Sequence, residues 1–468
     1  MGFAGFLLLA VARADPAVSP EWLLKEDSLR SEGAHWLAGS SEGLEAPFDV
    51  EGHWNELSFR VRLFGLASGG ALSPYRSLGD DEPGVVSLRE GFELHARSSL
   101  LEFRLASELW MDAPLGEDVL GASVEFPEYF AGIRWDWGRL GLGAEKRFIG
   151  PGRHGSLVMT DEARSYPGVV LSVNGQREKL GLVRAEVGTG WLQRPREDVA
   201  FPGLLHMDVR VSPVAWLEFG ASRMSMFGGV GRPNPSLWEL LVPLDPHVEN
   251  DREGELADQN EIAALDVRLS LPLGQWMGGP LSFVEAWYQY GGEDMIMREV
   301  AGIPVPSLAG VANLYGLEVG VAGAVLTLER AVLLDDTFRW YTGHRVYHQG
   351  FTQSGHSLGH PVGGDAESLW LGARWSLGPL GLEAWWEDLR RVGVVENLDG
   401  NVLTLSVDEE GWRTGVRGWK LERPGGWWGA GLEVERLDGV GFVPGVSASS
   451  VRVWVERRGA WRMAAESI

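Results

Sequence analysis

Hydrophobic and polar residues alternate with a period of two along most of this chain, from Leu57 to the C-terminus. Successive side chains of a β-strand point to opposite sides, so each such segment predicts a strand with one apolar face and one charged face. We count roughly 18 to 20 segments of this kind. The clearest segments are 57–63, 101–105, 133–137, 207–211, 265–271, 369–375 and 451–455.

The connections between these segments are alternately short and long. Glycine turns at 137–141 and 377–381 contrast with a long acidic and proline-rich stretch at 233–260. A soluble sandwich or propeller would pack the apolar faces against another sheet, whereas a membrane barrel would turn them toward lipid. The alternating connections and the Arg–Asp/Glu pairs on the charged faces favour the barrel, as do aromatic residues near segment ends: Trp110, Trp135, Trp137, Trp191, Trp340, Tyr341, Trp427 and Trp428. We therefore predict an all-β fold, a transmembrane antiparallel β-barrel of about 18 strands with a short N-terminal helical segment.

The two ends of the chain depart from the strand pattern. A short apolar stretch over 3–12 is followed by Ala12-Arg13-Ala14, which is typical of a signal peptide (residues 1–14) cleaved before Asp15. Residues 15–54 then predict a partly helical periplasmic segment, with an unpaired tail as the alternative. The barrel would occupy 55–468, with its last strand ending before Gly459.

Composition excludes several classes of protein. The 468 residues include 64 Gly and 22 Trp but no Cys, which leaves no disulfide or thiolate chemistry. The mean hydropathy of −0.08 is too low for a helical membrane protein. A net charge of −24 argues against nucleic acid as a partner, because phosphates need a basic surface. An acidic polysaccharide would need a local basic patch.

Three stretches resemble the Wzi family of capsule-assembly outer-membrane proteins. They are 145–168, which reads EKRFIGPGRHGSLVMTDEARSYPG, then 226–232 together with 260–268, and finally 341–365. The resemblance implies an eighteen-stranded barrel in the outer membrane, with a small helical element at the periplasmic end. It also implies a lectin-like role in which the protein attaches capsular polysaccharide or exopolysaccharide to the bacterial surface.

The first stretch supplies most of the candidate binding residues. Glycines at 150, 152 and 155 permit a tight loop, and nearby cationic side chains suit the carboxylates or hydroxyls of a sugar polymer. The alternative is that this loop folds into the lumen and braces the barrel. The candidates here, for polysaccharide binding or a lumen loop, are Arg147, Gly150, Pro151, Gly152, Arg153, His154, Ser156 and Arg164.

The other two stretches add Gly229, Arg232, Tyr341, His344, His348, His360 and Asp365. On a strand, His344 and His348 would share one face, which makes a metal site conceivable. Polar side chains facing the lumen and bonded to neighbours explain the same spacing, so we predict no metal and no cofactor.

The sequence lacks the motifs of nucleophile elbows, P-loops and zinc peptidases, so we predict that the chain is not an enzyme. The expected function is attachment of capsular polysaccharide or exopolysaccharide at the outer membrane, with outer-membrane lipid as the second partner and a monomeric state. One alternative is a porin-like channel for sugars or small solutes. Another is a secreted all-β glycoside hydrolase or lyase.

Overall fold

A computed structural model describes residues 54–70, 85–98, 100–114, 121–161, 163–177, 180–193, 196–236, 259–300, 303–334, 340–341, 344, 346–353, 356–396, 402–404, 408–422 and 426–464. The predicted signal peptide and all but the last residue of the predicted N-terminal segment lie outside these residues. No helix in the described ranges is long and apolar enough to cross a membrane.

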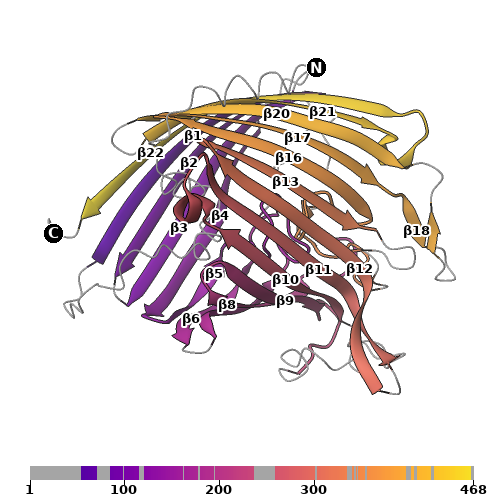
Figure 1. Cartoon of the computed structure of the whole chain (residues 1–468). Helices are drawn as coiled ribbons and strands as arrows, with labels where there is room; N and C mark the ends of the chain where they lie inside the picture. Colours follow the sequence, from indigo (N-terminus) through magenta and orange to yellow (C-terminus); the bar gives the residue numbers. More distant parts are fainter. Residues whose placement is uncertain are drawn as a thin grey trace.

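Eighteen strands in the described part of the chain form one closed antiparallel sheet (Figure 1). Each strand pairs with the next one along the chain, and the last pairs with the first, so the sheet has no free edge. The strands are β1 (Trp54–Gly70), β2 (Val85–Ser98), β3 (Leu101–Pro114), β4 (Gly121–Trp135), β5 (Gly138–Ala144), β6 (Pro167–Arg177), β7 (Gly181–Trp191), β8 (Gly203–Val214), β9 (Leu217–Phe227), β10 (Asn260–Leu271), β11 (Leu281–Val300), β12 (Ile303–Val321), β13 (Ala324–Leu333), β16 (Ala366–Leu377), β17 (Leu380–Arg391), β20 (Glu409–Glu422), β21 (Gly426–Asp438) and β22 (Ser447–Ala464). The predicted all-β barrel of about 18 strands is confirmed.

The alternating pattern places apolar side chains outside the barrel and ionic ones inside it. On β22, Val453 is 47% exposed whereas the neighbouring Arg452 is 7% exposed. On β8, Val209 is 42% exposed and Arg210 is 1% exposed. A sheet that is apolar on its outer surface suits a lipid environment, with the charged residues enclosed.

Short and long connections alternate around most of the barrel, as the sequence predicts; the exception is that the β10–β11 connection (272–280) is longer than the β11–β12 connection (301–302). One end carries short turns, including 136–137 between β4 and β5 and 378–379 between β16 and β17, and the short helix α6 (Leu273–Met277). The opposite end carries the long connections, which contain the small elements β14 (Thr352–Gln353), β15 (His356–Ser357), β18 (Val394–Glu396), β19 (Val402–Thr404) and η2 (Val440–Phe442).

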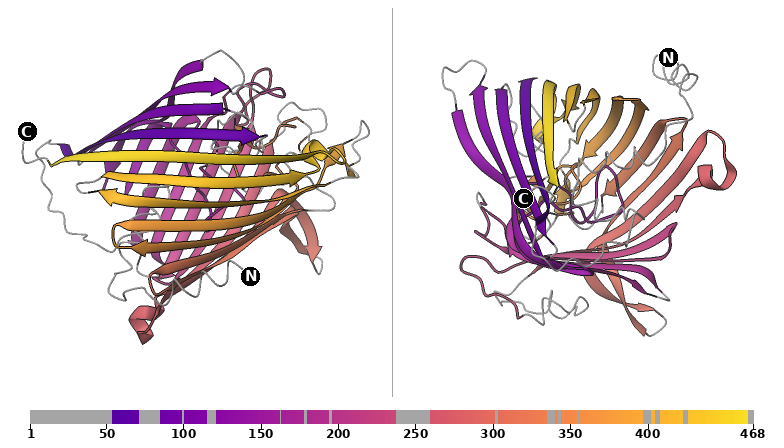
Figure 2. Two further views of the ribbon diagram at one scale, coloured as in Figure 1. Left: turned by 90° about the horizontal axis from the view of Figure 1, so that it is seen from above. Right: turned by 90° about the vertical axis from the view of Figure 1, so that its left-hand side faces the viewer.

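Two of the long connections fold back into the barrel (Figure 2). They are the β5–β6 connection (145–166) and the β13–β16 connection (334–365), and we call their described residues the plug. Leu157, Val158, Tyr347 and Phe351 of the plug are fully buried, and they belong to one hydrophobic cluster with inward-facing residues of the wall. The barrel interior therefore contains a packed core.

Two sequence-based predictions are wrong in detail. Trp340 and Tyr341 are each 2% exposed inside the barrel, because the connection that carries them folds inward, so they are not part of an outer aromatic girdle. The last strand does not end before Gly459. It continues to Ala464, because β1 begins at Trp54 and its first residues pair with the end of β22 through Glu56 and Ala464.

Candidate functional site

The glycine-rich loop of the plug binds a carboxylate of the barrel wall. The backbone N–H groups of Arg153, His154 and Gly155 donate to the Glu329 carboxylate at 2.7, 3.1 and 2.7 Å. Trp287 Nε1 donates to the same carboxylate at 3.1 Å. Glu329 lies on β13 and is 1% exposed, so these hydrogen bonds satisfy a charge that would be costly to bury alone. The loop therefore uses its backbone donors to hold the plug to the wall.

The side chains of this loop also contact the wall. Arg153 forms an ion pair with Glu285 on β11. The His154 ring stacks on Trp370 of β16 with centroids 5.1 Å apart, and its Nε2 lies 3.5 Å from Glu387 on β17. These contacts join the loop to three further strands.

The glycines allow the loop to pack closely. A Cβ on Gly155 would lie 2.1 Å from Cδ2 of His360, and one on Gly152 would lie 2.0 Å from the carbonyl oxygen of Gly155. Gly150 has a φ of 146°, a conformation that favours glycine, and Pro151 after it is buried. A larger residue at Gly155 would push the two connections of the plug apart, and larger residues at Gly150 or Gly152 would collide with Ser156 or Gly155 of the same loop.

Hydrogen bonds join the two halves of the plug. The Tyr341 hydroxyl donates to the carbonyl oxygen of Leu157 at 2.9 Å and accepts from the N–H of His360 at 2.7 Å. Ser156 hydrogen-bonds to the carbonyl oxygen of Ile149. Its neighbour Leu157 donates its N–H to Gln289 Oε1 of β11 at 2.9 Å. Sequence reasoning grouped Ser156, Tyr341 and His360 as candidates, and the structure brings them together.

A third connection, between β7 and β8, joins the plug through a buried ion pair. Arg196 and Asp198 have side chains that are 1% and 0% exposed, with Nη2 and Oδ2 2.7 Å apart. Arg196 also donates to the carbonyl oxygen of Thr352 at 2.8 Å, and Asp198 accepts from the N–H of Gln349 at 3.0 Å. Burial acts to raise the pKa of Asp198, but the hydrogen bonds from Arg196, Gln349 and Val199 lower it overall.

The β9–β10 connection contacts the same region. Tyr347 donates its hydroxyl to the carbonyl oxygen of Gly228 at 2.9 Å. Two candidates lie here: Gly229, whose φ is 100°, and Arg232, whose guanidinium lies 5.8 Å from the centroid of the Tyr347 ring. Arg232 thus contacts the plug, whereas Gly229 packs against Val199 of the β7–β8 connection.

Four further candidates are dispersed. Asp365 has a φ of 51° and accepts the N–H of Trp340 at 2.9 Å, which fixes the end of the plug. Arg164 is 3.1 Å from Glu125 on β4. His344 accepts N–H groups from its own turn at 3.2 Å. His348 is exposed in a turn rather than on a strand, so the predicted shared face of the two histidines is wrong.

The described ranges contain no group of three or more His, Cys, Asp or Glu residues arranged to hold a metal ion.

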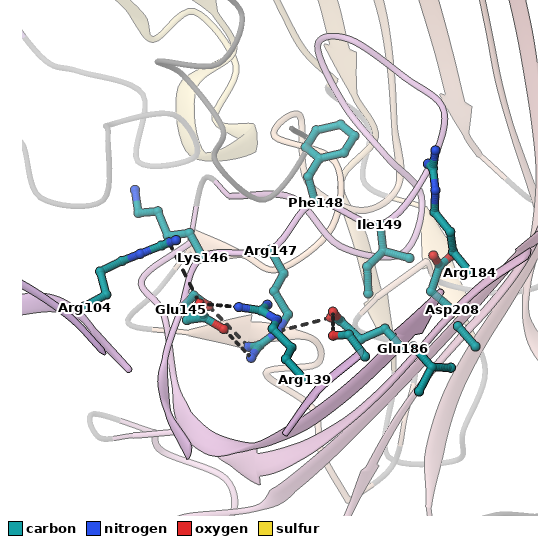
Figure 3. A pocket seen from close by; sticks show the side chains of 13 residues that line it. Arg104, Arg139, Glu145, Lys146, Arg147, Phe148, Ile149, Arg184, Glu186 and Asp208 are labelled. Atoms are coloured by element: carbon teal, nitrogen blue, oxygen red, sulfur yellow. Dashed lines mark hydrogen bonds and ion pairs between the residues drawn. The ribbon is translucent and has the colours of Figure 1, made fainter. Parts of the chain in front are cut away.

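A charged pocket lies between the plug and the wall (Figure 3). Segment 145–149 of the plug forms one side, and β3, β5, β6, β7 and β8 form the other. Five basic side chains line it: Arg104, Arg139, Lys146, Arg147 and Arg184. Three carboxylates also line it: Glu145, Glu186 and Asp208. The pocket thus has an excess of basic groups within a chain whose net charge is −24.

Arg147 anchors the plug side of this pocket. Its Nε lies 3.3 Å from Glu186 of β7, its Nη2 lies 3.6 Å from Glu145, and it lies over the Tyr166 ring at 5.9 Å. Burial acts to lower the pKa of Arg147, but Tyr166, Glu186 and Glu145 raise it overall. Burial also raises the pKa of Tyr166 to about 12, so its hydroxyl stays protonated and hydrogen-bonds to His206 Nδ1 at 2.8 Å.

Sequence reasoning missed most of the wall residues that matter here. Glu329, Gln289, Arg104 and Arg139 sit on strands whose alternation predicts that they face inward, but not which loop they meet. Arg196 and Asp198 lie in a connection that carries no recognisable motif. The sequence marks Glu329 only as the one acidic residue of β13.

Comparison with known proteins adds one family match and several similar folds. The family model described as capsule assembly protein Wzi matches residues 121–382, more than half of the chain. No curated protein sequence matches the chain. A solved structure titled as Wzi, an outer membrane protein involved in group 1 capsule assembly in Escherichia coli and a carbohydrate-binding β-barrel, is 18% identical, with a TM-score of 0.59 over 85% of this chain and 83% of that chain. OccAB2 from Acinetobacter baumannii is 10% identical, with a TM-score of 0.50 over 90% of this chain and 100% of that one. At these identities the solved structures support the fold.

Proposed function

The chain belongs to the Wzi capsule assembly protein family, and on this premise we propose that it holds capsular polysaccharide or exopolysaccharide at the outer membrane. The apolar outer face of the barrel would contact membrane lipid, and the connections at the long-loop end would face the polymer. We propose that the protein acts as a monomer, since the described sheet closes on itself within one chain.

The packed plug is the observation that carries this proposal. A channel for solutes needs a continuous aqueous path, whereas here two connections fold into the barrel and bury Leu157, Tyr347 and Phe351 against the wall. The backbone hydrogen bonds to Glu329 and the buried Arg196–Asp198 pair hold these connections in place. An interior built in this way favours a binding protein over the porin-like alternative.

The closed barrel with an apolar outer face also argues against a secreted hydrolase or lyase. A soluble enzyme would expose a polar surface, while this barrel exposes residues such as Val451, Val453 and Val455.

Binding of extracted surface polysaccharide to the purified protein in detergent tests the proposal. We expect saturable binding that a neutral, unrelated polymer such as dextran does not reproduce. Migration of unboiled and boiled samples on a gel confirms that the barrel is folded in the assay. Folded protein that fails to bind the extracted polymer would contradict the proposal.

A further inference from the structure

Two apolar side chains are exposed on neighbouring connections at the long-loop end of the barrel. Phe201 of the β7–β8 connection is 42% exposed, and Val230 of the β9–β10 connection is 67% exposed. Both lie past the ends of the strands, because Trp191, the last residue of β7, pairs with Gly203, and Gly203 pairs with Phe227 at the end of β9. We call Phe201 and Val230 the apolar rim. It extends beyond the part of the sheet that would face lipid.

The backbone that carries the apolar rim is fixed to the rest of the loops. The N–H of Val230 donates to the carbonyl oxygen of Ala200 at 2.9 Å, which joins the two connections. Gly229 packs against the same segment, since a Cβ on it would lie 2.4 Å from Cγ1 of Val199. The N–H of Val199 in turn donates to Oδ1 of Asp198 at 2.7 Å, and Asp198 is bound to the plug. The rim is therefore held in an ordered position.

The conformation of Phe201 is one that glycine adopts more readily. Its φ is 53°, in the left-handed region where a side chain is crowded by the backbone. Because the side chain is 42% exposed, its burial within the protein offsets only part of this strain. Strained residues that rigid surroundings hold in place are typical of ligand sites. The Phe201 ring is thus a candidate for contact with a ligand.

Exposed amide side chains accompany the apolar rim. Gln193 lies at the start of the β7–β8 connection, and Asn234 follows Val230 in the β9–β10 connection. The Asn234 amide lies against the end of β9, since its Oδ1 is 2.2 Å from the place of a Cβ on Gly228. Aromatic and aliphatic side chains contact the C–H groups of sugars, and amides donate to and accept from hydroxyl groups. This combination suits a saccharide.

We infer that the apolar rim contacts the polysaccharide, with the Phe201 ring against the C–H face of a sugar unit and Val230 beside it. The inference rests on the proposed function, because it names the surface and the type of contact by which the long-loop end would hold the polymer. Such a contact requires no charge on the sugar. It therefore suits a chain whose net charge of −24 would repel an anionic group.

Titration calorimetry of the full chain in detergent with the extracted surface polysaccharide tests this inference. Phe201→Gly removes the ring and suits the φ of 53°, so the variant should unfold at the same or a higher temperature yet bind about tenfold more weakly. Phe201→Tyr keeps the ring and should bind like the unaltered chain. Val443→Ser is the matched control and should also bind normally, because Val443 is 48% exposed in the β21–β22 connection on the other side of the barrel.

A Phe201→Gly protein that binds as tightly as the unaltered chain would overturn the inference and leave the proposed function standing. So would one that unfolds at a lower temperature, since the ring would then be structural, or an equal loss of binding in Val443→Ser.

Reconstitution into vesicles of phosphatidylethanolamine and phosphatidylglycerol identifies contact with lipid instead. If Phe201→Gly lowers the fraction of folded barrel in these vesicles and leaves polysaccharide binding unchanged, the ring contacts lipid and the inference is wrong. If the unaltered chain does not bind the polysaccharide, the proposed function fails and the inference fails with it.

Discussion

Individual charged residues inside this barrel act through the loops that they hold. Glu329 accepts hydrogen bonds from three consecutive backbone N–H groups and from Trp287, and it is buried at 1% exposure. A buried carboxylate with several donors is stabilised by them, and the donors in turn depend on its two oxygens. A single wall residue thereby fixes the conformation of residues 153–155.

Replacement of this carboxylate should weaken the plug. Glu329→Gln replaces one carboxylate oxygen with an amide NH2 group, which cannot accept the N–H groups that now bind that oxygen. We expect the free energy of unfolding to fall by about 2–3 kcal/mol. Urea unfolding of the folded protein in detergent, followed by tryptophan fluorescence, measures the change. Glu410→Gln, at an exposed glutamate on β20, is the control and should change stability by less than about 0.5 kcal/mol. Equal unfolding curves for both variants would contradict this role of Glu329.

Close packing at Gly155 makes a second residue-level prediction. Gly155→Ala places a Cβ 2.1 Å from the His360 ring, so the two halves of the plug must separate, and we expect a loss of about 1–3 kcal/mol. The same substitution at Gly175 on β6 meets no atom within 4 Å and should be nearly neutral. Thermal unfolding of both variants measures the difference. A Gly155→Ala protein as stable as Gly175→Ala would show that the halves are not tightly packed.

At the scale of elements, the plug is an assembly of connections from different parts of the chain. The β7–β8 connection contributes Arg196 and Asp198, which bind the backbone of residues 349–352 in the β13–β16 connection. Most of the described residues of each connection lie outside helices and strands, so their conformation depends on such contacts with the other connections. Loss of one contact should therefore affect more than one loop.

Asp198 makes the stability of this assembly depend on pH. Its pKa lies below the ordinary value of 3.8, so its contribution is complete above that value and is lost as the pH falls through the lower pKa of the folded protein. Asp198→Asn should cost about 2 kcal/mol at neutral pH, and the gap from the unaltered protein should narrow below pH of about 3.8. Urea unfolding of both proteins at several pH values measures the gap, with Asp136→Asn in an exposed turn as the control. A gap that stays constant down to the most acidic pH would argue against this ion pair.

The sequence predicts the elements better than it predicts their assembly. Period-two alternation identifies the strands and the face that each turns outward, because burial in lipid or lumen follows directly from side-chain direction. The glycines and cationic residues of 145–168 also identify this stretch of the sequence as a loop with candidate binding residues. The sequence does not predict that Gly155 meets His360 or that residues 153–155 bind Glu329, because these contacts join positions about 170 to 200 residues apart along the sequence. The prediction that Trp340 and Tyr341 lie at the membrane interface is wrong for the same reason: the position of an aromatic residue in the sequence does not reveal that its connection folds into the barrel.

The whole molecule is a closed barrel with an apolar exterior and an interior filled by its own loops. The plug packs inside the barrel, and the charged pocket lies between the plug and the wall formed by β3 and β5 to β8. The charged residues that line the wall pair with each other and with the plug. Their presence therefore does not imply that a charged solute passes through the barrel.

Electrical recording should show this closure. Purified protein inserted into planar lipid bilayers should give no stable, ohmic conductance steps if the plug, whose Leu157, Tyr347 and Phe351 are fully buried, closes the lumen as we propose. The Gly155→Ala variant should conduct more often than the unaltered protein, since its plug is loosened. Steady open-pore conductance from the unaltered protein would favour the channel alternative.

The fate of the surface polysaccharide in cells that lack this chain tests the central claim most directly. Cell-bound and released polymer are measured in the parent strain, in a deletion strain and in the deletion strain that expresses the chain again. We predict that deletion moves polymer from the cell surface into the medium without reducing the total, and that expression of the chain returns it to the surface. A deletion strain that keeps its full surface layer of polysaccharide would contradict the account.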